Sequence, residues 1–127
     1  MISRETVHLA EVPADHAAEF VDWMSHRLER RLSVPDLQAA GLRYAGGRML
    51  IIDDSPVADF LYTRVNGAPI GVCVVRGGGM PSPLRVVARG ALRLATWAEG
   101  GVTYIVVGDL DAATARRIAA LVASQQT

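Results

Sequence analysis

Four turn signals recur between short apolar segments, and they constrain the fold of this chain more than any other feature. Gly46-Gly47, Asn66-Gly67 and Gly100-Gly101 are pairs that accept the positive φ angles of a two-residue hairpin turn, and residues 53–56 (DDSP) have turn-forming composition. The segments between these turns have the length and the β-branched content of strands. The spacing therefore predicts an antiparallel meander with the strands LRYA, RMLIID, VADFLYTRV, PIGVCVVR and VTYIVV.

The segment of residues 84–98 (LRVVARGALRLATWA) fits either a helix or a strand by its pattern of apolar residues. Gly90 disfavours a helix by about 1 kcal/mol, and the Gly100-Gly101 turn that follows favours a hairpin partner. We therefore expect a strand with a bulge or kink near Gly90. In such a strand Arg85, Arg89 and Arg93 would share one face. That face is either a solvated surface or a positive surface for an anionic partner.

Two amphipathic helices are expected, one before and one after the meander in the sequence. A strand over residues 5–12 ends at Pro13, and Asp15 is placed to cap the first helix. The last helix follows Asp111, which is its expected N-cap. Each helix carries one apolar stripe at helical spacing. The stripes are Ala17, Phe20, Val21, Met24 and Leu28 in the first helix, and Ala115, Ile118, Ala119 and Val122 in the last.

A third, short helix is expected where Pro35 suits a first helical position and Gly41 a left-handed stop. The order of elements predicts an α+β fold: an antiparallel meander sheet with an N-terminal strand–helix unit and a C-terminal helix packed on one face. The 127 residues suit one soluble domain over residues 1–127, and half of them are hydrophobic. The formal net charge is zero, so the charge balance does not indicate a nucleic-acid partner.

The sequence indicates no nucleotide site, no metal site and no nucleophile motif. The stretch GGVTYIVVGDLD places its paired glycines before the strand, and it contains neither G-x-G-x-x-G nor a P-loop. The three histidines show no metal-ligand spacing, and G-x-S-x-G is absent. We therefore expect no catalytic residue, no metal and no cofactor. Asp109 is left without a structural explanation.

Cys73 is the only cysteine, so an internal disulfide is excluded. It lies in the apolar run IGVCVV, and we expect a buried, unreactive thiol. A lone cysteine is compatible with the cytoplasm and with the periplasm. The first 13 residues lack the apolar core of a signal peptide, and no apolar run approaches the ~18 residues of a membrane span.

Three stretches, in this order, resemble motifs in the extracytoplasmic C-terminal half of proteobacterial transmembrane anti-sigma factors. They are EVPADHAAEFVDWMSHRLERRLSVPDL, AAGLRYAGGRMLI and WAEGGVTYIVVGDLD. Together they span nearly the whole chain. The residues that match the family pattern form a framework set of Trp23, Pro35, Asp36, Leu37, Gly46, Gly47, Trp97, Gly101, Tyr104 and Gly108.

The resemblance implies a periplasmic sensor or regulatory domain of an inner-membrane protein. In that family a cytoplasmic half holds an extracytoplasmic-function sigma factor inactive, one membrane helix follows, and the outer half meets a stimulus or a protein partner. No sigma-binding or zinc-binding residue is implied for this chain, which matches the outer half alone. The alternatives are a stand-alone module that binds a small ligand or a metal, and, least favoured, a small enzyme. A homodimer through the open sheet edges is a further expectation.

Overall fold

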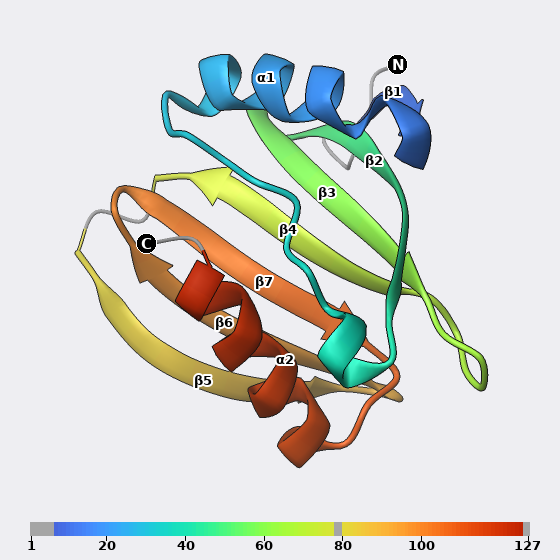
Figure 1. The fold of residues 1–127 in the computed structure, drawn as a ribbon. Coiled ribbons are helices and arrows are strands. Elements are labelled where there is room, and N and C mark those ends of the chain that lie inside the picture. Colours follow the sequence, from blue (N-terminus) through green and yellow to red (C-terminus); the bar gives the residue numbers. More distant parts are fainter. Residues whose placement is uncertain (1–6, 78–79, 126–127) are drawn as a thin grey trace.

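Seven strands form one antiparallel sheet in the computed structural model, which describes residues 7–77 and 80–125. Their order across the sheet is β1-β2-β3-β4-β7-β6-β5 (Figure 1). The expected α+β class is confirmed. The strands are β1 (Val7–Pro13), β2 (Arg43–Ile52), β3 (Ser55–Thr63), β4 (Ile70–Arg76), β5 (Ser82–Arg89), β6 (Leu92–Glu99) and β7 (Val102–Gly108). The helices are α1 (Ala17–Leu28) and α2 (Ala112–Gln125), with 3-10 turns at Ala14–His16 and Gln38–Ala40.

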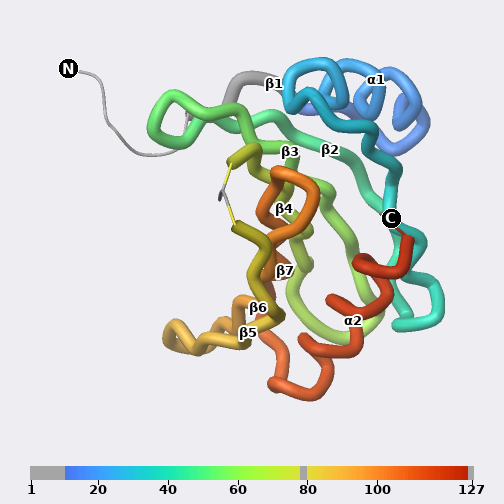
Figure 2. The backbone as a smooth tube through the Cα atoms, turned by 90° about the vertical axis from the view of Figure 1, so that its left-hand side faces the viewer, coloured from blue at the N-terminus to red at the C-terminus, as the bar shows by residue number. Residues whose placement is uncertain are grey.

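Both helices lie on the same face of the sheet (Figures 1 and 2). α1 contacts β1, β2 and β3, whereas α2 contacts β5, β6 and β7. The segment of residues 29–42, here called the strap, leaves α1 and crosses this covered face toward the start of β2 (Figure 1). The core lies between the sheet and the layer of helices and strap. Residues that pair across neighbouring strands point to the same face, so the core residues form rows across the sheet. Its central row is Phe60, Val72, Val106 and Ala95, all fully buried.

Two of the four expected turns are present as two-residue turns. Asp53 and Asp54 adopt φ angles of 50° and 67° between β2 and β3, and Gly100 and Gly101 adopt 61° and 82° between β6 and β7. Successive positive φ angles match the right-handed twist of antiparallel strands, which is why these two turns can close their hairpins. The two-residue turn expected at Asn66-Gly67 is wrong, because this pair lies within a longer connection over residues 64–69, in which only Gly67 has a positive φ angle.

The expected turn at Gly46-Gly47 is wrong, because β2 runs through both glycines as one strand. The pairing of β2 with β3 shifts by one residue between Tyr44 and Gly46. A Cβ on Gly47 would lie 2.4 Å from the ring of Phe20, which packs on this point of the strand. The glycine pair therefore provides a bulge and a close approach of α1 to the sheet.

The single strand expected over residues 84–98 is also wrong, because β5 and β6 form a hairpin with its turn at Gly90. Gly90 adopts a φ of 60°, so it is a turn residue and not a kink within a strand. The short helix expected after Pro35 is only the 3-10 turn Gln38–Ala40, which Gly41 stops with a φ of 76° as expected.

The two helices match their expected stripes, but only one has the expected cap. Asp111 accepts a hydrogen bond from the backbone N–H of Thr114 at 2.7 Å, and all four stripe residues of α2 are buried. In α1, Phe20, Met24 and Leu28 are buried. Asp15 does not cap α1, because it lies within the preceding 3-10 turn, and the N-cap position belongs to His16, which makes no capping bond. The first strand is described only from Val7, so residues 5–6 of its expected range lie outside the described part.

Candidate functional site

The expected row of three arginines is split between the two faces of the sheet. Arg85 pairs with Thr96 and Arg89 with Leu92, so these two side chains share one face. Arg93 pairs with Ala88 and with Gly108, one residue out of phase, and therefore lies on the face that α2 covers. In a single strand, residues 85, 89 and 93 would point to the same face. The chain reverses at the Gly90 turn, so Arg93 of β6 points to the opposite face from Arg85 and Arg89 of β5.

The face that carries Arg85 and Arg89 is covered by neither helix, and we call it the bare face. Cross-strand pairing runs Leu61, Gly71, Val107, Leu94 and Val87 across five strands of this face. The four side chains of that row are half-buried. A second row of this face runs from Arg48 through Asp59, Cys73, Ile105 and Thr96 to Arg85. Leu92, 42% exposed, and Ile52, 39% exposed, also lie on this side.

A buried ion pair lies within this second row. Arg48 donates from Nη2 to Oδ2 of Asp59 at 2.8 Å and from Nε to the same oxygen at 3.2 Å. Asp59 is 3% exposed, and its other oxygen accepts from the Cys73 thiol at 3.5 Å. Burial and the Asp59 carboxylate together raise the pKa of the Cys73 thiol far above its usual range. The thiol is therefore protonated and unreactive at neutral pH, as the sequence suggested.

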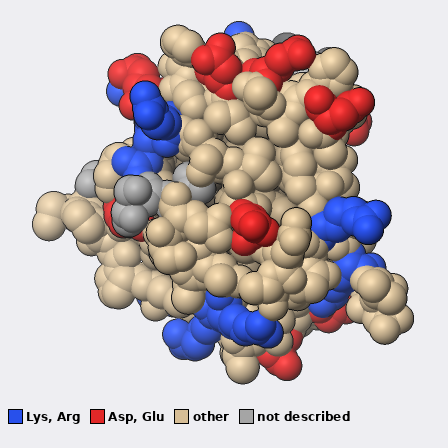
Figure 3. Space-filling view, in the orientation of Figure 1, with Lys and Arg blue, Asp and Glu red and all other residues tan. Residues whose placement is uncertain are grey.

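The covered side of the molecule has a different chemical character. Acidic side chains gather over α1 and arginines gather nearer α2 (Figure 3). Within α1, Glu19 and Asp22 are exposed, and Arg27 lies 5.0 Å above the ring of half-buried Trp23. The helix side thus carries exposed charges of both signs, whereas the bare face combines an aliphatic row with the Arg48–Asp59 pair and two arginines at the β5 edge.

The framework residues near β6 and β7 form part of the core. Trp97 and Tyr104 stack with ring centroids 5.1 Å apart, and the Tyr104 hydroxyl accepts from Nε of Arg30 at 3.1 Å. Gly101 lies in the β6–β7 turn, and a Cβ on Gly108 would approach Ile70 to 3.0 Å. Tyr104 therefore connects the sheet to the strap through Arg30, and none of these residues lines the pocket described next.

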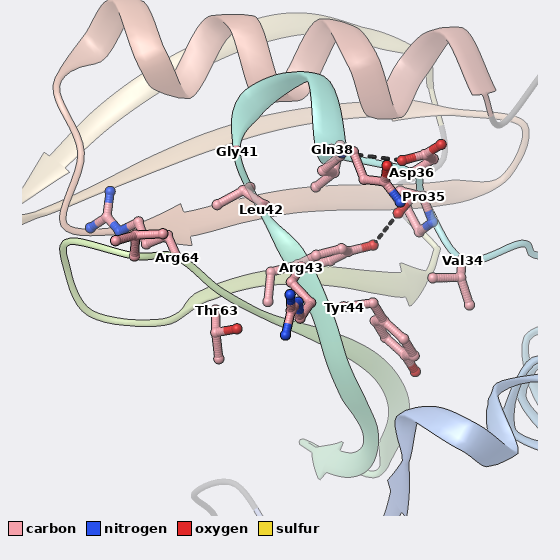
Figure 4. A pocket seen from close by; sticks show the side chains of 13 residues that line it. Val34, Pro35, Asp36, Gln38, Gly41, Leu42, Arg43, Tyr44, Thr63 and Arg64 are labelled. Atoms are coloured by element: carbon pink, nitrogen blue, oxygen red, sulfur yellow. Dashed lines mark hydrogen bonds between the residues drawn. The ribbon is translucent and has the colours of Figure 1, made fainter.

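Pro35, Asp36 and Leu37, in contrast, line a pocket of about 770 Å³ between the strap and the ends of β2 and β3 (Figure 4). The backbone of Asp36 is held to α2 by two bonds: its N–H donates to Oε1 of Gln125 at 2.7 Å, and its carbonyl accepts from Nε2 at 2.8 Å. The Asp36 carboxylate accepts from the backbone N–H of Gln38 at 3.1 Å. The remaining lining is Val34, Gly41, Leu42, Arg43, Tyr44, Tyr62, Thr63, Arg64 and Val65.

Two tyrosines flank the inner end of this pocket. Tyr62 donates its hydroxyl to the Pro35 carbonyl at 2.5 Å. The Tyr44 hydroxyl is buried without a hydrogen-bond partner among the described residues, and burial raises its pKa to about 12. Both hydroxyls are therefore protonated at physiological pH. Arg64, at the outer end, donates to the backbone carbonyls of Ala68 and Asp109, so Asp109 contributes its main chain.

His16 and His26 lie exposed on the first helical segment, whereas His8 lies in β1. His16 contacts the Glu19 carboxylate at 2.9 Å, and that hydrogen bond raises the pKa of its imidazole. His26 contacts the carbonyl of Asp22 at 2.8 Å. Over residues 7–77 and 80–125, no three His, Cys, Asp or Glu side chains are grouped so that they could hold a metal ion.

Comparison with known proteins does not assign the chain to a family. No family model matches the sequence, and no curated protein matches it either. None of the helices within the described residues is long and apolar enough to span a membrane.

Proposed function

We propose that this chain is the periplasmic sensor or interaction domain of a membrane-bound anti-sigma factor, and that it acts by binding and not by catalysis. The anti-sigma part of the proposal rests on the order of the three sequence motifs. In this proposal an extracytoplasmic-function sigma factor is bound through a cytoplasmic half, an inner-membrane helix links the two halves, and the present domain meets a periplasmic protein.

The observation that carries the interaction part is the bare face. The seven strands average eight residues, and at about 3.3 Å per residue and about 4.8 Å between strands the sheet spans roughly 890 Å². That area is close to the ~800 Å² which each partner contributes to a standard protein interface. One row across this face is aliphatic, and the row beside it holds the Arg48–Asp59 ion pair. Arg85 and Arg89 add positive charge at the β5 edge of the face. Such a surface favours a protein partner over a small polar ligand.

The bare face allows a test within the complete protein. Replacing Leu94 by Glu puts a charge into the aliphatic row, while the half-buried position leaves the core intact. We expect transcription from the sigma-dependent promoter to lose its response to the stimulus, with the domain still folded by circular dichroism. Glu at exposed Ala113 on α2 is the matched control. An unchanged response after deletion of the whole domain would refute the proposal, and an adjacent sigma-factor gene would support it.

The alternative function is that of a module that binds a small ligand, and the pocket beneath the strap is the observation in its favour. Its volume lies within the range of small-molecule sites. A ligand that binds only the folded state raises the melting temperature, and the rise continues with the logarithm of ligand concentration above Kd. Thermal melts of the purified chain against metal ions and anionic metabolites test this alternative. A concentration-dependent shift that Arg43→Ala abolishes would establish it.

A further inference from the structure

The outer edge of β5 is open among the described residues. β5 is the last strand of the sheet and pairs only with β6. One row of its backbone N–H and C=O groups therefore points away from the sheet, where another extended segment can pair with it. Pro83, which has no N–H, lies near the start of β5, so pairing is available chiefly over residues 84–89.

The two sides of this edge differ in chemistry. Leu84 and Val86 are partly buried against the core on the side of α2. Arg85 and Arg89 are exposed on the bare face, with half-buried Val87 between them. Within the described residues, Arg85 has no hydrogen bond or ion pair, and Arg89 donates only to the carbonyl of its neighbour Ala88, at 3.3 Å. The edge thus combines an apolar side with two guanidinium groups that have no acidic partner.

We propose that the β5 edge binds an extended acidic segment of a partner protein, which adds to the sheet as an eighth strand. Backbone hydrogen bonds to residues 84–89 hold the segment in register. Its alternate side chains are acidic where they lie beside Arg85 and Arg89, and apolar where they lie beside Leu84 and Val86. Opposite charges on neighbouring strands stabilise such pairing, and like charges oppose it.

The same arginines act against a second copy of this chain at this edge. A two-fold antiparallel pairing of β5 with β5, centred on Val87, would set Arg85 beside Arg89 of the second copy on one face. Two such like-charge pairs would form, without an acidic residue to neutralise them. The charge pattern therefore selects an acidic partner over self-association.

The inference names the partner chemistry for the interaction domain proposed above, and so it rests on that function. It is tested on the purified chain with a ten-residue peptide of alternating Glu and Val. The comparison peptide has Lys in place of every Glu. We expect the Glu peptide to bind, and to protect outward-pointing amides of residues 84–89 from hydrogen exchange. Binding should weaken as salt is raised, because exposed charges are screened.

Charge reversal separates a specific edge from general attraction. Arg85→Glu with Arg89→Glu should weaken binding of the Glu peptide by at least about tenfold and should create binding of the Lys peptide. Arg116→Glu, on the exposed side of α2, is the control and should leave binding unchanged. Absence of Glu-peptide binding, insensitivity to the double reversal, or amide protection outside β5 would each overturn the inference.

The cellular experiment distinguishes failure of the edge from failure of the proposed function. If the partner binds at the β5 edge, Arg85→Glu with Arg89→Glu in the complete protein alters sigma-dependent transcription. If transcription responds to Leu94→Glu but not to the double reversal, the interaction function stands and the β5 proposal is wrong. If neither substitution nor deletion of the domain changes transcription, the proposed function fails, whereas peptide binding still reports on the edge.

Discussion

Tyr44 and Tyr62 lie directly opposite each other on β2 and β3, yet only one of their hydroxyls is bonded. The rings meet edge-on with centroids 5.6 Å apart. Tyr62 donates to the Pro35 carbonyl and so ties the strap to the sheet, whereas the buried Tyr44 hydroxyl has no partner among the described residues. Two neighbouring residues of the same type therefore contribute differently to the same pocket wall.

This pair gives a matched test. Tyr62→Phe removes a buried hydrogen bond and leaves the Pro35 carbonyl without its donor, so we expect it to lower the free energy of unfolding by about 1–2 kcal/mol. Tyr44→Phe removes a hydroxyl that gains no hydrogen bond on folding, so it should be neutral or slightly stabilising. Urea unfolding of the two variants measures both effects. Equal losses in the two variants would contradict the hydrogen-bond assignment.

Gly47 is expected to tolerate no side chain while Phe20 is present. In Gly47→Ala the new Cβ would meet the Phe20 ring, and the resulting overpacking should cost about 1–3 kcal/mol. Phe20→Ala costs more by itself, because it removes a core ring. On that background, however, the alanine at residue 47 should cost much less. A double-mutant cycle on thermal or urea stability measures this coupling, and additive effects would show that the two residues do not meet.

We expect removal of one member of the Arg48–Asp59 ion pair to destabilise the fold more than removal of both. Arg48→Met leaves a buried carboxylate without its counter-charge, and we expect a loss of about 2–3 kcal/mol. That is below the cost for a fully buried pair, because the Arg48 side chain is 35% exposed. Arg48→Met combined with Asp59→Leu removes both charges and should recover most of the loss. Urea unfolding at neutral pH compares both variants with the wild type, and a double variant as unstable as the single one would contradict this account.

Asp111 should make the stability of the protein depend on pH in the acidic range. The hydrogen bonds from Thr114 lower the pKa of the Asp111 carboxyl below its usual range. A lowered folded-state pKa stabilises the fold above the unfolded-state pKa, and this contribution is lost as pH falls through the folded-state pKa. Asp111→Asn keeps a capping oxygen but does not titrate. Between pH 6 and strongly acid pH, wild type should therefore lose stability relative to this variant in thermal melts, and parallel curves would argue against the cap.

Local signals predicted the elements that depend on neighbours in sequence. The stripe of α2 and its Asp111 cap follow from helical spacing, and the turns at Asp53-Asp54 and Gly100-Gly101 follow from residues that accept positive φ angles. Gly46-Gly47 carries the same local signal, but it lies inside a strand because Phe20, 27 positions away in the sequence from Gly47, packs there. A glycine needed for space and a glycine needed for a turn look alike in a sequence.

Sequence alone determined the α+β class, the two amphipathic helices and the hairpin turns at Asp53-Asp54 and Gly100-Gly101, since these depend on the spacing of apolar residues and on backbone preferences. Tertiary structure decided the strand order, with β7 paired to β4 and β5 sent to the outer edge. It also placed Arg93 on the opposite face from Arg85 and Arg89, and left one face of the sheet bare. These features depend on which strands pair and in which register, and pairing energy comes from contacts between residues far apart in the chain.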